Sequence, residues 1–197
     1  MKHFNSIFLT ALILLLLPIN SSAQSNVPIN KLKSFGLLVN WPFIEEALPE
    51  GPGYAPTIIQ GNFRFPLLNN DSKHQFTMLL QPQFNPVGHL EGQSEYLWEA
   101  GLNVGFAYEY LISPQVGILY AGLGAGPHFV NVETSLQADG FIFSDNFYVG
   151  MHQFVGNQSW FLTYEVRFRH ISNAGLQSPN GGIDNFFLGF GVSYFLF

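Results

Sequence analysis

The sequence predicts an all-β fold, an eight-stranded antiparallel transmembrane β-barrel, on three observations. Charged residues make up only 10% of the 197 residues, whereas 47% are hydrophobic and 16% are aromatic. A soluble domain usually carries about 25% charged residues. Eight segments alternate apolar residues with polar or small ones, which is the two-residue period of a strand. Long and short connections alternate between these segments, as in outer-membrane barrels, whose periplasmic turns are short.

The first 23 residues are predicted to be a signal peptide rather than part of the barrel. Lys2 precedes an apolar run at residues 7–17, and small residues ending at Ala23 follow it. This order of charge, apolar core and small residues is typical of a cleavable export signal. The alternative is a membrane anchor, but the run is shorter than the roughly 20 residues that span a bilayer. We therefore expect residues 24–197 to form an exported barrel domain.

Composition also limits the partners and the chemistry. Cysteine is absent, which excludes disulfides and a lipid anchor on a processed cysteine. The formal net charge of −6 comes from 7 basic and 13 acidic residues, and loss of Lys2 makes it −7. Nucleic-acid-binding domains are basic, so we expect no nucleic-acid partner. His74, His89, His128 and His152 are scattered without metal-ligand spacing, so we predict no metal and no cofactor.

The expected strands follow from the alternation. They cover residues 33–42, 57–67, 75–84, 96–111, 117–130, 143–155, 159–172 and 184–197. Pro66, Pro82 and Pro127 fall within these segments and lack the backbone donor that a strand ladder needs, so we expect bulges or strand ends there.

The two faces of each expected strand differ in character. Aromatic residues such as Trp98, Trp160 and Tyr194 lie near the ends of the apolar faces, where interfacial girdles form in membrane barrels. The opposite faces carry ionisable residues that would lie inside a closed barrel and could pair there. These residues are Glu99, Glu109, Glu165, Arg167 and Arg169. Phe187 and Phe195 break the alternation of the last strand, which suggests that they fill the interior.

Three polar residues carry the parity of the apolar faces. His170 and Ser172 are two residues apart, so they point to the same side of an extended chain as the apolar residues before them. Asp184 shares the apolar face of the next strand, and residues 173–183 connect the two strands. We therefore expect all three side chains to meet on the outside of the barrel at its extracellular rim.

Polar groups on a lipid-coated face are costly, and a catalytic triad would account for them. Ser172 would be the nucleophile, His170 its general base and Asp184 the carboxylate that orients the imidazole. Loop amides near Asn173 and Gly175 could stabilise the developing oxyanion. The alternative is that His170 and Ser172 are rim residues at the level of the lipid headgroups, since His-X-Ser is a common tripeptide.

The segment from His170 to Leu176, followed by Pro179-Asn180 and Gly182-Ile183, resembles the C-terminal signature of the PagL family of lipid A 3-O-deacylases. The resemblance covers residues 167–184. It implies an eight-stranded outer-membrane barrel whose His-Ser-Glu triad faces the membrane.

The resemblance also implies roles for individual residues. His170 matches the general base and Ser172 the nucleophile, while Asp184 stands where the family's typical enzyme has Glu. Asn173 and Gly175 match oxyanion-hole residues, and Asn180 matches a loop asparagine important to activity. Because Asp is one methylene shorter than Glu, Asp184 must approach His170 more closely to act.

The leading hypothesis is thus a serine esterase that removes the 3-O-linked 3-hydroxyacyl chain from lipid A of lipopolysaccharide in the outer membrane. The expected partners are this substrate and the surrounding outer-membrane lipids, and the sequence leaves a homodimer open. Two other readings remain: a non-catalytic structural or adhesion barrel, and a related phospholipid esterase with the same residues.

Overall fold

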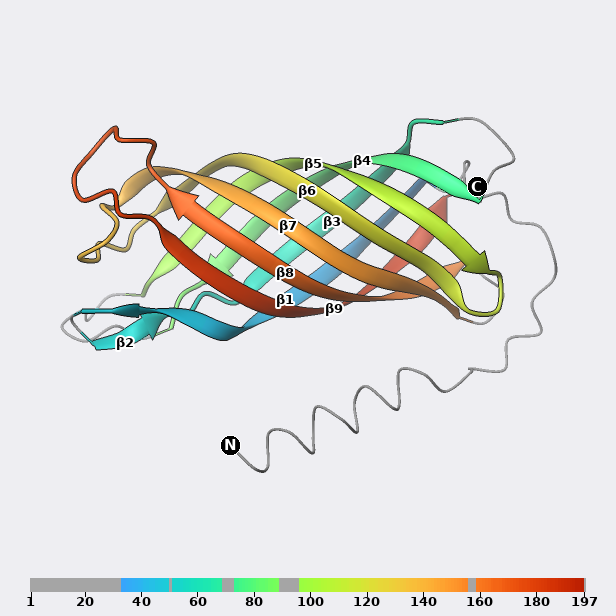
Figure 1. The fold of residues 1–197 in the computed structure, drawn as a ribbon, viewed down its shortest axis with the longest axis horizontal. Coiled ribbons are helices and arrows are strands. Elements are labelled where there is room, and N and C mark those ends of the chain that lie inside the picture. Colours follow the sequence, from blue (N-terminus) through green and yellow to red (C-terminus); the bar gives the residue numbers. More distant parts are fainter. Residues whose placement is uncertain (1–32, 50, 69–72, 89–95, 156–158, 197) are drawn as a thin grey trace, which may run out of the picture.

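The barrel closes where its first long strand pairs with its last. In the computed structural model, β1 pairs with both β3 and β9, and the other long strands pair in sequence order with antiparallel neighbours. The structure describes residues 33–49, 51–68, 73–88, 96–155 and 159–196. The predicted signal peptide, residues 1–23, lies outside the described residues. Figure 1 shows the tilted strands, with the longer connections gathered at one end.

Among the described residues, eight strands form the ring, and a ninth, short strand pairs with β1. The elements are β1 (Lys33–Leu48), β2 (Gly51–Tyr54), β3 (Ile58–Pro66), β4 (His74–Pro86), β5 (Trp98–Ser113), β6 (Gly117–Val130), β7 (Gly140–Val155), β8 (Trp160–Ser172) and β9 (Ile183–Leu196). The predicted class and strand number of the barrel are confirmed. The first strand is longer than predicted, and β2 falls in a segment predicted to be a loop.

The prolines behave differently from one another. Pro66 ends β3, as predicted. Pro82 and Pro127 lie inside β4 and β6, and no register shift occurs at either, so the predicted bulges are wrong. Pairing with β3 stops beside Pro82 and resumes in the same register, and pairing of β6 with β5 does the same beside Pro127. Because proline has no N–H, each residue interrupts the hydrogen bonds to one neighbouring strand, but neither inserts the extra residue that defines a bulge.

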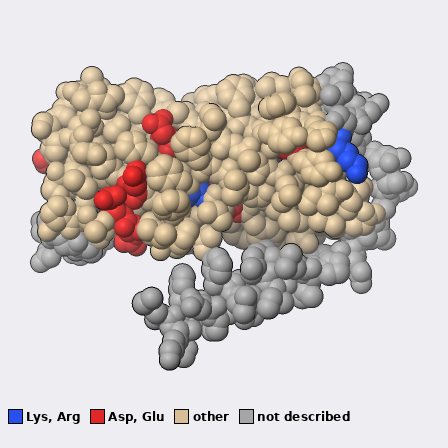
Figure 2. All heavy atoms as spheres, viewed as in Figure 1, with Lys and Arg blue, Asp and Glu red and all other residues tan. Residues whose placement is uncertain are grey.

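The outer wall is apolar, as the alternation predicts. Large hydrophobic side chains project from it and are about half exposed; they include Leu37, Phe63, Phe84, Leu102, Phe106, Leu123, Phe147, Val149, Val166 and Phe190. Figure 2 shows a face that is mostly uncharged, on which the larger clusters of acidic side chains lie toward the long-loop end. Within the described ranges, no helix is long and apolar enough to cross a membrane. A lipid-facing wall explains why so many large apolar side chains remain uncovered by protein.

Ion pairs and aromatic rings fill the interior. Three pairs have side chains no more than 3% exposed: Arg64–Glu109 at 2.5 Å, Arg167–Glu165 at 2.8 Å and Arg169–Glu99 at 2.6 Å. Phe187 and Phe195 are also fully buried. The predicted inward filling is confirmed, and each charge has the partner that a low-dielectric interior demands.

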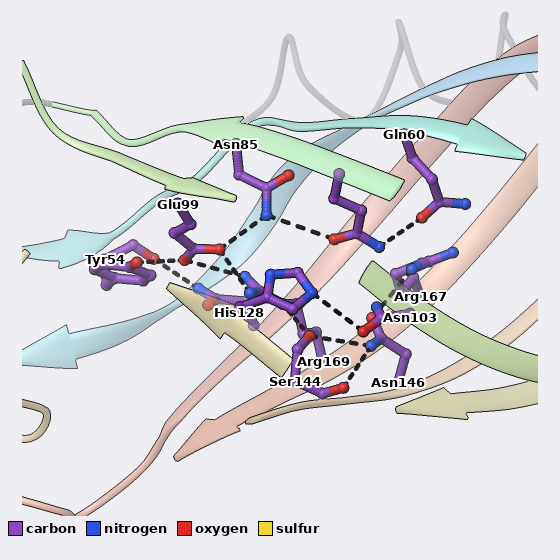
Figure 3. Close-up of polar contacts among 12 residues, drawn as sticks. Tyr54, Gln60, Asn85, Glu99, Asn103, His128, Ser144, Asn146, Arg167 and Arg169 are labelled. Atoms are coloured by element: carbon purple, nitrogen blue, oxygen red, sulfur yellow. Dashed lines mark hydrogen bonds and ion pairs between the residues drawn. The ribbon is translucent and has the colours of Figure 1, made fainter. Parts of the chain in front are cut away.

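The long-loop end of the interior is closed by a polar network beneath a hydrophobic cap. In Figure 3, Arg169 donates to Glu99, and Tyr54 and Asn85 donate to the same carboxylate. Tyr54 belongs to β2, and its backbone carbonyl accepts a hydrogen bond from the Asn185 side chain of β9 at 2.7 Å. The cap is a cluster of buried side chains: Leu48, Tyr54, Val87, Leu97, Val130, Val132, Ile142, Ile171 and Ile183. Tyr54 of β2 thus contacts both β8 and β9, because it shares the cap with Ile171 and Ile183 and accepts the bond from Asn185.

Candidate active site

The last four residues of β8 alternate between the interior and the outer wall. Arg169 and Ile171 are buried, whereas His170 and Ser172 are partly exposed on the outside. Ile171, which lies between His170 and Ser172 in the strand, packs into the hydrophobic cap and so anchors this part of the backbone. The sequence prediction that both polar side chains point outward agrees with this arrangement.

His170 and Asp184 are direct cross-strand partners in the β8–β9 ladder. The imidazole Nδ1 lies 2.7 Å from Asp184 Oδ1, which is hydrogen-bonding distance. The His170 side chain is 36% exposed and that of Asp184 is 50% exposed. Opposed residues in antiparallel strands have Cβ atoms about 5 Å apart, so the shorter carboxylate is already within reach. The missing methylene does not prevent contact.

Ser172 lies one row farther toward the loop, opposite Phe143 of β7. Two residues of extended chain separate it from His170 by about 7 Å along the strand. Within the part of the chain that the structure describes, the Ser172 hydroxyl forms no hydrogen bond with the imidazole. Catalytic hydrogen bonds are often long in substrate-free structures and tighten when substrate binds. The structure thus brings His170 and Asp184 together and leaves Ser172 beside them.

The loop after Ser172 is braced by its own polar groups. The Asn173 N–H donates to Asn180 Oδ1 at 2.8 Å, and the Asn173 amide donates to the carbonyls of Gln177 and Pro179. The Gly175 N–H donates to Asn173 Oδ1 at 3.0 Å. The three loop residues singled out in the sequence therefore hold the loop in shape, and two of their backbone donors are engaged there.

Ala174 is the residue between those two engaged donors. Its φ of 55° is a left-handed backbone conformation that non-glycine residues seldom adopt. Among the described residues, its N–H donates to no partner. Strained backbone conformations often occur at functional sites. A free amide two residues after a candidate nucleophile is a suitable donor for an oxyanion.

Sequence reasoning missed two neighbours of His170. Asp145 of β7 pairs with His170 across the β7–β8 ladder, so a second carboxylate lies on the other side of the imidazole in the same outward row. Gly182 packs against the ring from the loop. The parity of Asp145 was visible in the sequence, but its register against β8 was not. No group of three or more metal-ligating residues occurs in the described segments.

Comparisons with known proteins support this fold and this segment. The sequence profile for "Lipid A 3-O-deacylase (PagL)" matches residues 61–193. The fold is similar to that in "Crystal structure of the outer membrane enzyme PagL", with a TM-score of 0.58 and 17% identity over 80% of this chain and 97% of that chain. No curated protein sequence matches the chain. The profile match runs from β3 into β9 and includes all three candidate residues.

Proposed function

The chain belongs to the PagL family of lipid A 3-O-deacylases, and on that premise we propose that it acts through Ser172, His170 and Asp184. Family membership makes it an ester hydrolase of the outer membrane whose substrate is lipid A of lipopolysaccharide. The proposal concerns which residues perform this reaction and how.

Asp184 would fix the tautomer and direction of the imidazole. A carboxylate that accepts from Nδ1–H leaves Nε2 as the basic nitrogen, ready to take a proton. The 2.7 Å contact between His170 Nδ1 and Asp184 Oδ1 is the single observation that carries the proposal. A hydrogen-bonded histidine and carboxylate are otherwise costly to place on an outward face among apolar residues.

Ser172 would attack the ester carbonyl of the 3-hydroxyacyl chain at the sugar 3-position. His170 accepts the hydroxyl proton as the new bond forms, and then gives it to the leaving sugar oxygen. Water activated by the same imidazole hydrolyses the acyl-enzyme and releases the free fatty acid. The hydroxyl must approach Nε2 for the first step, which a modest side-chain movement on substrate binding would achieve.

The oxyanion would be stabilised by the loop that follows Ser172. The Ala174 N–H is unengaged among the described residues, while Asn173, Gly175 and Asn180 keep the loop rigid around it. A donor that is already in place costs no reorganisation when charge develops.

The outward position of the site suits a lipid substrate. The acyl chains of lipid A lie in the membrane that surrounds the barrel, so an ester near the headgroups can reach the outer wall without entering the filled interior. Phe168 and Phe186 pack against each other one row below His170 and Asp184, with tilted rings whose centroids are 5.1 Å apart. They would offer an apolar surface to the acyl chain being released.

The direct test is mass spectrometry of lipid A from cells that express single variants. The unmodified chain should remove one 3-hydroxy fatty acid, and Ser172→Ala should remove none. Ser178→Ala is the matched control, because Ser178 is exposed in the same loop, and it should act as the unmodified chain does. Loss of the acyl group in cells expressing Ser172→Ala would refute the assignment.

A second measurement addresses substrate class and the nucleophile together. A serine-reactive lipid phosphonate should label the purified protein at Ser172, and Ser172→Ala should take up no label. Glycerophospholipid vesicles should release no fatty acid when the protein is present. Release from them would favour the related phospholipid esterase instead.

A further inference from the structure

Gly182 lies against the imidazole in the loop, one residue before β9 begins. Its φ is +76°, and a Cβ added there would lie 2.5 Å from His170 Cε1 and 3.1 Å from Nε2. Real Cβ atoms do not approach other atoms as closely as the first distance, so any side chain at this position must displace the ring. The backbone of residue 182 and the imidazole thus fit together only because glycine stands there.

We propose that Gly182 is a positioning residue that holds the free edge of the His170 imidazole. Asp184 holds the ring at Nδ1, and Gly182 lies beside the adjoining Cε1–Nε2 edge, where an added Cβ would collide with Cε1. The proposed role rests on the function proposed above only in assigning His170 as the base. The packing itself does not depend on that assignment.

A half-exposed ring with one hydrogen bond needs a second constraint. The His170 side chain is 36% exposed, so protein does not enclose it on all sides. A ring tethered at Nδ1 alone can pivot about that bond and turn Nε2 away from Ser172. Contact along the Cε1–Nε2 edge removes this freedom, which is the preorganisation that proton transfer requires.

The loop that carries Gly182 is itself held in place. The Gly181 N–H donates to the carbonyl of Leu136 at 2.6 Å, and Asn180 forms a bridge with Gln137. Both contacts tie the loop before β9 to the loop before β7. The wall beside the imidazole is therefore supported by a neighbouring connection.

Gly140 provides a matched control for backbone strain. Its φ is +95°, so it makes the same left-handed demand as Gly182, but the nearest atom to an added Cβ is Gln177 Oε1 at 3.4 Å. Alanine is strained at both positions, whereas asparagine tolerates the left-handed region better. Comparing Ala with Asn at each site therefore separates the effect of backbone strain from the effect of a collision between the new side chain and the imidazole.

The experiment measures turnover and folding of Gly182→Ala, Gly182→Asn, Gly140→Ala and Gly140→Asn in detergent micelles. Both changes at 182 should lower kcat by about 100-fold, the scale expected when a catalytic group is misplaced by about 1 Å. KM should stay close to that of the unmodified protein, and heat-modifiable migration should show folded barrels. Both changes at 140 should leave kcat near its original value.

A spectroscopic readout reports the ring directly. In protein with ¹⁵N-labelled histidine, the proton on His170 Nδ1 should give a hydrogen-bonded resonance, assigned by its disappearance in His170→Asn. That resonance should be lost in both variants at 182 and kept in both at 140. Lost resonance with full turnover would support the positioning and contradict the proposed role of His170 as base.

Three results would overturn the inference. One is recovery of turnover in Gly182→Asn but not Gly182→Ala, since backbone strain would then be the cause. Another is retention of both the resonance and turnover in the two variants. The third concerns assembly. If Gly182→Ala fails to assemble, adding His170→Ala should restore assembly by removing the collision, and a double variant that still fails would contradict the inference.

Discussion

Arg169 and His170 are consecutive residues of β8 that point to opposite faces of the barrel. Arg169 is fully buried, where its guanidinium pairs with Glu99 at 2.6 Å and also donates to Ser144. His170 is partly exposed on the outer wall, and its imidazole meets Asp184 at 2.7 Å. Each side chain has a carboxylate partner, yet Arg169 lies in a closed interior network and His170 is partly exposed on the outer wall.

The difference shows how a barrel separates stability from chemistry. An interior pair must be fully satisfied because an unpaired charge there is costly, which leaves it no capacity to bind a substrate. The outer pair leaves the imidazole 36% exposed, so a reacting group can approach it. Changes on the inner face should therefore affect folding, whereas changes on the outer face should affect turnover.

The largest effect is expected from His170→Asn, which removes the proposed general base from the outer face. Turnover should fall by about 10⁴-fold, the scale seen when a triad histidine cannot act. The urea midpoint for unfolding should not change, because the side chain is partly exposed and belongs to no interior network. Release of 3-hydroxy fatty acid from lipid A in micelles measures the first quantity. Turnover close to that of the unmodified protein would remove His170 from the mechanism.

Arg169→Met tests the inner face by leaving Glu99 buried without its cation. The free energy of unfolding should fall by about 3–5 kcal/mol, the cost of breaking a buried pair. Urea unfolding from lipid bilayers, followed by tryptophan fluorescence, measures it. Arg169→Met combined with Glu99→Gln should recover part of the loss. Folded Arg169→Met should keep its turnover, and a loss as large as that of His170→Asn would erase the distinction between the faces.

Asp184 offers a graded test on the outer face. Asp184→Asn should lower kcat by about 100-fold, because the amide cannot fix the reactive tautomer, and general base catalysis is worth about 10²–10⁴-fold. Asp184→Glu should keep most of the turnover, since a longer carboxylate can still accept from Nδ1. Equal kcat values for Asp184→Asn and the unmodified enzyme would show that the 2.7 Å contact has no catalytic role.

The smallest effect is expected from Asp145→Asn. Asp145 lies opposite His170 in the β7–β8 ladder, but in the described part of the chain it forms no ion pair with the ring. Its removal should change kcat by less than about fivefold, the scale of an exposed charge interaction. Steady-state rates measured beside those of Asp184→Asn would check this. A loss as large as that of Asp184→Asn would mean that both carboxylates act on the imidazole.

Parity made the faces of the barrel predictable from the sequence. Alternation along single strands placed Glu99 and Arg169 inside and His170 and Asp184 outside, because side chains of an extended chain point to opposite faces in turn. The same rule placed Phe187 in the interior, where the residue is fully buried.

Contacts between distant segments could not be predicted in this way. Which acid pairs with Arg169 depends on geometry across the interior, and Glu99 lies 70 residues away in the sequence. The packing of Gly182 on the imidazole depends on the loop path. The sequence analysis missed β2 because its four residues, Gly-Pro-Gly-Tyr, show no alternation of apolar and polar residues. Their strand conformation depends on pairing with β1, which the local sequence does not reveal.

The exposure of His170 and Asp184 on the outer wall also determines how the site meets other molecules. If the proposed site is correct, substrate encounters would take place in two dimensions, and the rate would follow the surface density of lipid A in the leaflet rather than a concentration in solution. A compound designed to block Nε2 must first dissolve in that leaflet, and its potency will track its partition coefficient as closely as its fit to the imidazole.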